Sequence, residues 1–128
     1  MRLLLDTHAL LWWVAGSSQL SDAAREAIGD ESAHALVSAA SAWEITTKFR
    51  LGKLPEYAVV AADVGKVIVE RGFAPLPISV EHAQQAGALS GAHGDPFDRM
   101  LAAQALLDGL VLVSSDSAFE AFGVSRLW

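Results

Sequence analysis

The segment Arg2-Leu3-Leu4-Leu5-Asp6-Thr7 decides the fold, because a short apolar run stops abruptly at a polar pair. Consecutive leucines are typical of a buried strand that is covered on both faces. A second run of this kind, Leu110-Val111-Leu112-Val113, leads into Ser114-Ser115-Asp116. Between them, short apolar runs alternate with helical patterns. This alternation predicts an α/β fold, a three-layer α/β/α arrangement around a central, mostly parallel sheet.

The pattern along the rest of the chain completes this picture. Strands are expected at 2–5, 34–38, 110–113 and 124–128, and two prolines hold residues 73–78 in an extended segment. Helices are expected at 7–14, 22–28, 39–51, 80–89, 96–107 and 117–122, with one or two more within 56–70. No repeat or linker divides the 128 residues, so we expect one domain over 1–128.

Composition excludes several classes of protein. The chain is 52% hydrophobic and 19% charged, unlike a disordered tail, and it has no cysteine for a disulfide, a thiolate zinc site or a nucleophile. Its apolar runs are too short to span a membrane, and Asp6 comes too early for a secretory signal, so we expect a cytoplasmic protein. The net charge of −6, from 15 acidic and 9 basic residues, argues on its face against a general nucleic-acid binder.

Two aspartates far apart in sequence are expected at the same edge of the sheet. Asp6 and Asp116 each follow a predicted strand, and ligands of open α/β sheets bind beyond the carboxyl ends of the strands. Each aspartate also precedes a predicted helix, so each is equally a candidate N-cap. The two roles are compatible, since a capping carboxylate can also face a site.

Three further carboxylates stand on, or at the start of, helices that lead to this edge. Asp98 falls in the first turn of the helix at 96–107, beside its buried face, although a favourable interaction with the helix dipole also explains it. Asp95 is well placed as the N-cap of the same helix. Glu44 sits between apolar neighbours with Lys48 four residues on, which leaves a surface Glu–Lys pair as the alternative.

Carboxylates that converge in this way predict a site for a hard divalent cation. Mg²⁺ and Mn²⁺ take oxygen ligands, usually a few carboxylates and waters, and the histidines lack the spacing of a zinc site. Carboxylate-held metals commonly serve phosphoryl transfer. We expect His34, His82 and His93 to be structural or exposed.

Four motifs in this order resemble the PIN-domain ribonucleases, and specifically the VapC-type toxins of bacterial toxin–antitoxin systems. They are Leu4-Leu5-Asp6-Thr7-His8, Ser41-Ala42-Trp43-Glu44-Ile45, the segment 95–105, and Leu112-Val113-Ser114-Ser115-Asp116. One Asp-Thr pair after a strand is weak evidence, but four motifs in this order are strong, and the resemblance covers essentially the whole chain. It implies that the catalytic and metal-binding residues are Asp6, Glu44, Asp98 and Asp116, with Asp95 secondary.

The resemblance also implies an activity and partners. The implied activity is Mg²⁺- or Mn²⁺-dependent hydrolysis of RNA phosphodiester bonds. The implied partners are a cognate antitoxin that blocks the site and a second copy of the chain in a homodimer. The basic residues near the acids, candidates for RNA phosphates, are Lys48, Arg50, Lys53 and Arg99. A solvated helix face, a local ion pair of Arg99 or contacts with the antitoxin explain them equally.

Without the four site acids the chain carries 11 acidic and 9 basic residues, so the charge does not exclude RNA as substrate.

Two other functions compete with a toxin ribonuclease. A phospho-receiver domain needs an acidic pair after its first strand and a late lysine, but Asp6 has no acidic neighbour and no lysine follows Val113. A catalytically silent PIN domain that acts only as a binding module is the remaining alternative.

Overall fold

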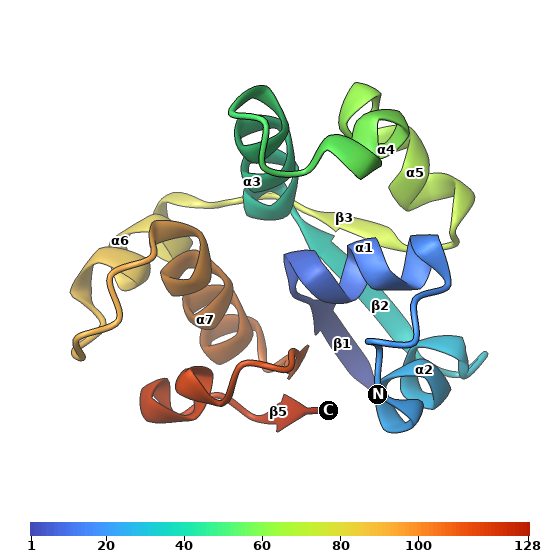
Figure 1. Ribbon diagram of the computed structural model, residues 1–128. Coiled ribbons are helices and arrows are strands. Elements are labelled where there is room, and N and C mark those ends of the chain that lie inside the picture. Colours follow the sequence, from blue (N-terminus) through green and yellow to red (C-terminus); the bar gives the residue numbers. More distant parts are fainter.

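The computed structural model describes residues 1–128, and a five-stranded sheet forms its centre (Figure 1). Its strands are β1 (Arg2–Leu5), β2 (His34–Ser38), β3 (Ala74–Leu76), β4 (Val111–Val113) and β5 (Arg126–Leu127). They lie side by side in the order β3-β2-β1-β4-β5, and every pairing is parallel. The predicted parallel sheet is therefore confirmed.

Helices occupy the intervening segments. They are α1 (Thr7–Ala15), α2 (Asp22–Gly29), α3 (Ala39–Arg50), α4 (Ala58–Ala62), α5 (Val64–Glu70), α6 (Val80–Ala88) and α7 (Pro96–Asp108), with 3₁₀ turns η1 (Pro55–Tyr57) and η2 (Ser117–Phe122). One or two helices were predicted over 56–70, and the helical region breaks at Asp63. Asp63 has an extended backbone, and its side chain accepts a hydrogen bond from the Lys66 N–H as the N-cap of α5. The strand predicted at 124–128 has only two paired residues, because its sole partner β4 is itself short.

The sheet separates two hydrophobic cores, as the leucine run predicts. Side chains alternate along a strand, so Leu3 and Leu5 belong to one core and Leu4 to the other. The first core includes residues of α1, α2 and α5, and the second includes residues of α7 and η2. These helices lie on opposite sides of the sheet in Figure 1, which gives the three-layer α/β/α arrangement.

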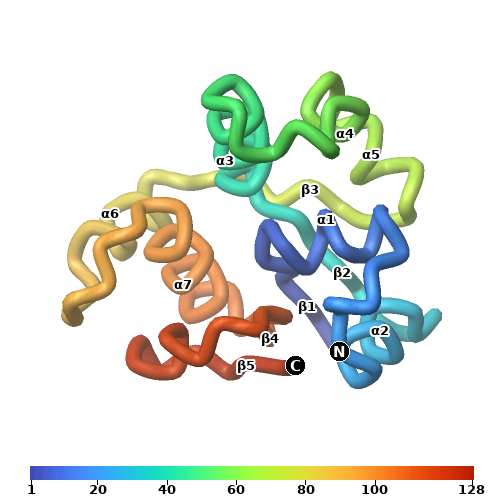
Figure 2. Tube along the Cα trace, in the orientation of Figure 1, coloured from blue at the N-terminus to red at the C-terminus, as the bar shows by residue number.

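The order of the strands places a crevice at the end of β1. The chain leaves β1 through α1 and α2 to reach β2 on one side, whereas α7 leads into β4 on the other side (Figure 2). A sheet that reverses its winding in this way opens beyond the carboxyl ends of the central strands, where ligands of α/β proteins bind. None of the helices combines the length and apolar character needed to cross a bilayer.

Candidate functional site

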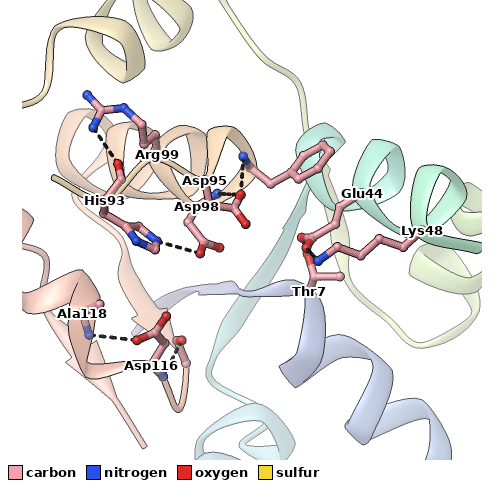
Figure 3. Close-up of polar contacts among 11 residues, drawn as sticks. Thr7, Glu44, Lys48, His93, Asp95, Asp98, Arg99, Asp116 and Ala118 are labelled. Atoms are coloured by element: carbon pink, nitrogen blue, oxygen red, sulfur yellow. Dashed lines mark hydrogen bonds and ion pairs between the residues drawn. The ribbon is translucent and has the colours of Figure 1, made fainter. Parts of the chain in front are cut away.

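A polar cavity of about 170 Å³ lies at the carboxyl ends of the central strands, and carboxylates from separate segments line it. The acids on its wall are Asp6, Glu44, Asp95, Asp98 and Asp116. The structure thus brings together all the acids expected from the sequence. Figure 3 shows four of these segments converging on a common space.

Asp6 joins the end of β1 to the start of α1. Its N–H donates to Val113 O of β4 at 3.0 Å, and its Oδ1 accepts a hydrogen bond from the Ala9 N–H at 2.8 Å. Burial raises the pKa of the Asp6 carboxyl, and the nearby charge of Glu44 acts in the same direction, against opposing hydrogen bonds from Ser114 and Ala9. Asp6 is therefore both an N-cap and a wall of the cavity.

Glu44 is buried in the middle of α3, with both carboxylate oxygens bonded. Oε1 accepts a 2.6 Å hydrogen bond from the Thr7 hydroxyl, which also lies 3.0 Å from Ser41 Oγ. Oε2 forms an ion pair with the Lys48 ammonium. The Glu–Lys pair left open by the sequence does form, but Glu44 is only 4% exposed, so it is not a surface pair.

Lys48 brings a positive charge into this acidic cavity. Burial by itself lowers the pKa of its ammonium group. The hydrogen bond and charge of Glu44, together with the charges of Asp95 and Asp98, outweigh burial and raise the pKa. Lys48 is therefore charged and partly balances the acids around it.

Asp95 and Asp98 are positioned by the start of α7. Asp95 Oδ1 accepts hydrogen bonds from the N–H groups of Phe97 (2.9 Å) and Asp98 (3.2 Å), as its predicted N-cap role requires. Burial raises the pKa of Asp98, and the charges of Asp95 and Glu44 raise it further, while a hydrogen bond with His93 acts against both. Asp98 thus stands over the cavity instead of pointing into solvent.

Asp116 is the most exposed of the acids and caps η2. Its Oδ1 accepts from the Ala118 N–H at 2.9 Å, and its own N–H donates to Ser114 Oγ at 3.0 Å. Its carboxylate comes within 4.8 Å of a possible ligand atom on each of Asp98 and His93. The predicted cap is confirmed, and the position at the cavity is compatible with it.

His93 lies beside the cavity and contacts a site acid, a contact that the sequence did not predict. Its Nε2 lies 2.9 Å from Asp98 Oδ2 (Figure 3), which is compatible with the expected structural role. The sequence does place His93 two residues before Asp95, the N-cap of α7. This nearness to the first turn of α7 was the feature that could have indicated the contact.

The basic residues divide into three environments. Lys48 lines the cavity, and Arg50 and Lys53 are exposed at and just beyond the end of α3. The guanidinium of Arg99 is not among the cavity groups. It donates instead to three backbone carbonyls of the α6–α7 region, and it pairs with no carboxylate.

The donor set fits a hard divalent cation. Carboxylate oxygens predominate, and a triad of His93, Asp98 and Asp116 offers ligand atoms within 4.8 Å of one another. Burial and the charges of neighbouring acids raise the pKa values of Asp6 and Asp98, and the charge of a bound cation acts against this rise. Oxygen-rich sites of this kind suit Mg²⁺ or Mn²⁺.

Comparisons with known proteins agree with this architecture. VapBC2 from Rickettsia felis bound to a promoter DNA fragment superposes with a TM-score of 0.71 at 15% identity, covering 98% of this chain and 97% of the other. A toxin–antitoxin complex from Klebsiella pneumoniae gives 0.60 at 18% identity (93% and 90% coverage). VapC20 from Mycobacterium tuberculosis, a sarcin–ricin loop cleaving toxin, gives 0.63 at 17% identity, with 95% coverage of each chain.

Identities this low establish the fold alone. No curated protein sequence matches the chain. The family model described as the PIN domain, however, matches residues 3–124. That match spans nearly the whole chain, including β1, α3, α7 and β4, which carry the four motifs and the cavity. The resemblance seen in the sequence is confirmed, and the chain belongs to the PIN-domain family.

Proposed function

We propose that this protein is a metal-dependent endoribonuclease of the VapC toxin type, with residues 1–128 acting as one domain. The observation that carries the proposal is the convergence of acids from four segments on one cavity, within a PIN fold. Mg²⁺ or Mn²⁺ is the expected cofactor. The acids proposed to hold it are Asp6, Glu44, Asp98 and Asp116, with Asp95 secondary and the His93 imidazole beside them.

The geometry supports hydrolysis of a phosphodiester bond. When bound, such an ion polarises a phosphate oxygen and offsets the negative charge that develops there. Contacts within the protein position the acids: Thr7 and Lys48 bind Glu44, and helix-cap hydrogen bonds hold Asp6 and Asp116. Preorganised groups of this kind need no rearrangement during the reaction.

The substrate and partners follow from the family relationship and the charges. VapC20 is described as a toxin that cleaves the sarcin–ricin loop, which supports RNA as the substrate class. The Klebsiella structure is a toxin–antitoxin complex, which supports a cognate antitoxin that neutralises this chain. We further propose a homodimer, as the resemblance implies. Lys48 at the cavity, and Arg50 and Lys53 beyond it, are the proposed contacts to RNA phosphates.

An RNA cleavage assay with and without metal tests the enzyme. The wild-type protein is expected to cleave RNA in Mg²⁺ or Mn²⁺ and to stop when EDTA is added, whereas Asp6→Asn is expected to be inactive. Asn is as good an N-cap as Asp, so this variant keeps the fold while removing one charge. Equal cleavage by both proteins, or none with any metal and RNA tested, favours the silent binding module.

A growth experiment tests the toxin assignment separately. Expression of the wild-type chain is expected to arrest bacterial growth, and co-expression of the small protein encoded beside it is expected to restore growth. Asp6→Asn serves as the control for nonspecific burden. Growth arrest by this variant as well would contradict a toxin that acts through the acidic cavity.

A further inference from the structure

One guanidinium shapes the loop that connects α6 to α7. Arg99 Nε donates to Ala86 O at 2.9 Å, Nη1 donates to His93 O at 3.0 Å, and Nη2 donates to Leu89 O. These carbonyls lie at the end of α6 and along the loop that follows it. The planar fork of arginine suits several acceptors at once, which a lysine ammonium cannot bond in the same arrangement.

The loop carries His93 against Asp98. The imidazole Nε2 lies 2.9 Å from Asp98 Oδ2, and the ring also faces Phe119 and Phe122, with centroids 6.4 and 6.0 Å away. Because a carboxylate only accepts, the hydrogen bond requires the proton on His93 Nε2. Figure 3 shows the continuous path from the Arg99 fork through the His93 backbone and ring to the Asp98 carboxylate.

We propose that Arg99 and His93 are positioning residues for Asp98, with Arg99 setting the loop and His93 orienting the carboxylate. The proposal rests on the proposed function, in which Asp98 helps to hold a divalent cation. Asp98 stands in the first turn of α7, and no other side-chain hydrogen bond fixes its carboxylate oxygens. Hydrogen-bond partners behind a ligating carboxylate typically change metal affinity or activity 10- to 100-fold when removed.

The contacts with backbone carbonyls give Arg99 a structural role that differs from binding RNA. All three of its bonds end on backbone oxygens, and its guanidinium carbon lies 5.7 Å from the Phe122 ring centroid. An arginine committed in this way has few donors left for a phosphate. Its place directly after Asp98 allows one residue to couple the loop to the helix that carries the ligand.

The first test reads the imidazole by ¹⁵N NMR in metal-free protein. A hydrogen-bonded Nε2–H exchanges slowly with water, so wild type is expected to show such resonances for His93 and for His82, whose Nε2 lies 3.1 Å from Asp108 Oδ2. Arg99→Lys and Asp98→Ala, which has no acceptor for the Nε2–H, are expected to lose the His93 resonance and to keep that of His82. Retention of both resonances in Arg99→Lys would overturn the inference.

The second test measures Mn²⁺ affinity by calorimetry on the folded variants. His93→Ala and Arg99→Lys are each expected to weaken binding about 10-fold. His93→Gln, which keeps an N–H donor, is expected to stay within about threefold of wild type. The double variant His93→Ala/Arg99→Lys is expected to bind no more weakly than His93→Ala, because both act through one contact. Unchanged affinity or additive losses would overturn the inference.

Arg25→Lys is the matched control. Arg25 Nη2 also donates to backbone carbonyls, those of Ser17 (3.0 Å) and Leu20 (3.3 Å), but in the loop between α1 and α2. Loss of these two hydrogen bonds is expected to lower the melting temperature without changing Mn²⁺ affinity. A loss of affinity equal to that of Arg99→Lys would overturn the inference. A wild-type protein that binds no Mn²⁺ contradicts the proposed function, and the His93 resonance then decides the inference alone.

Discussion

The Thr7 hydroxyl donates a 2.6 Å hydrogen bond to Glu44 Oε1, across 37 residues of sequence. Thr7 begins α1 directly after β1, whereas Glu44 lies inside α3 after β2. With Lys48 on the other oxygen, the contact makes burial of this carboxylate tolerable, because buried charges require partners. It also locks together the two helices that form one wall of the cavity.

Thr7→Val tests the importance of this contact. The substitution keeps the shape of the side chain but leaves Glu44 Oε1 without its donor, which is expected to cost about 1–3 kcal/mol in the free energy of unfolding. RNA cleavage is expected to fall about 10-fold or more, because Glu44 loses its orientation. Urea denaturation and a cleavage assay measure the two effects.

Thr46→Val is the control for Thr7→Val, placed on α3, the helix that carries Glu44. The Thr46 hydroxyl donates only to the Ala42 carbonyl (2.8 Å) and Trp43 carbonyl (3.1 Å) on an exposed face. We expect a stability change within about 0.5 kcal/mol and full cleavage activity. Similar losses in the two variants would show that the Thr7–Glu44 contact has no special role.

Lys48→Met is expected to change metal and RNA binding in opposite directions. The ammonium repels a cation from the acids and attracts RNA phosphates, and its raised pKa keeps it charged at neutral pH. We therefore expect Mn²⁺ to bind about 5-fold more tightly and the KM for RNA to rise by a similar factor, about 1 kcal/mol each. Calorimetry and steady-state cleavage measure the two constants. A change of the same sign in both would rule out this account of Lys48.

The acids at strand ends and helix starts were predictable because these are local features of the sequence, whereas Glu44, in the middle of α3, was assigned to the site through the resemblance. The run Leu3–Leu5 is buried on both faces, as expected for a central strand. The residue that follows such a strand, Asp6, therefore lies at the edge of the sheet. Asp98 was predictable from helical spacing beside the buried face of α7. Asp95 and Asp116 were predictable as caps, and their second position at the cavity follows from the parallel order of the strands.

The contacts of His93 and Arg99 were not predictable in this way. Both depend on the path of an irregular loop, which carries no periodicity, and on hydrogen bonds to backbone carbonyls that any residue type offers. From the sequence, a basic residue directly after a site acid is a candidate phosphate contact, and the carbonyl contacts of Arg99 carry no signal there. One or two helices were predicted within 56–70, but the position of the break at Asp63 was not, since one extended residue interrupts an otherwise helical pattern.

Burial of Asp6 makes the metal-free protein less stable as pH rises. Burial raises the pKa of Asp6 in the folded state, so the unfolded chain loses this proton first and stability declines up to the folded-state value. Asp6→Asn cannot ionise, and we expect it to raise stability at neutral pH in EDTA by about 0.5–2 kcal/mol, a few degrees in Tm. Thermal melts across pH measure this; a variant less stable than wild type, with an unchanged pH profile, would contradict it.

Metal binding is expected to reverse that order of stability. A ligand that binds only the folded state stabilises it by about 2.7 kcal/mol at 100 times its Kd. Saturating Mn²⁺ should therefore raise the Tm of the wild-type protein strongly and that of Asp6→Asn much less. The measurement is a pair of thermal melts with Mn²⁺ and with EDTA. Equal shifts in both proteins would mean that Mn²⁺ binds elsewhere.

Arg50 and Lys53 are expected to contribute to RNA binding without contributing to the chemical step. Both are exposed near the end of α3, beyond the cavity that Lys48 lines. Each contact to a phosphate of single-stranded nucleic acid changes the salt dependence of log affinity by about 0.7, so Arg50→Met/Lys53→Met should lower the slope of RNA binding by about 1.4. Binding at several salt concentrations, with inactive Asp6→Asn as background, measures that slope, and kcat in the active background should stay unchanged.

Lys66→Met/Arg71→Met makes the same change in net charge at residues that do not line the cavity. Lys66 lies on α5, where it pairs loosely with Glu70 at 3.8 Å, and exposed Arg71 follows that helix. This control is expected to leave the salt slope of RNA binding as in the background protein. An equal decrease of the salt slope in both double variants would show that overall charge, and not a local contact with RNA, causes the effect. If neither slope changes, Arg50 and Lys53 do not contact RNA phosphates, and contacts with the antitoxin become the better account of their place beside the cavity.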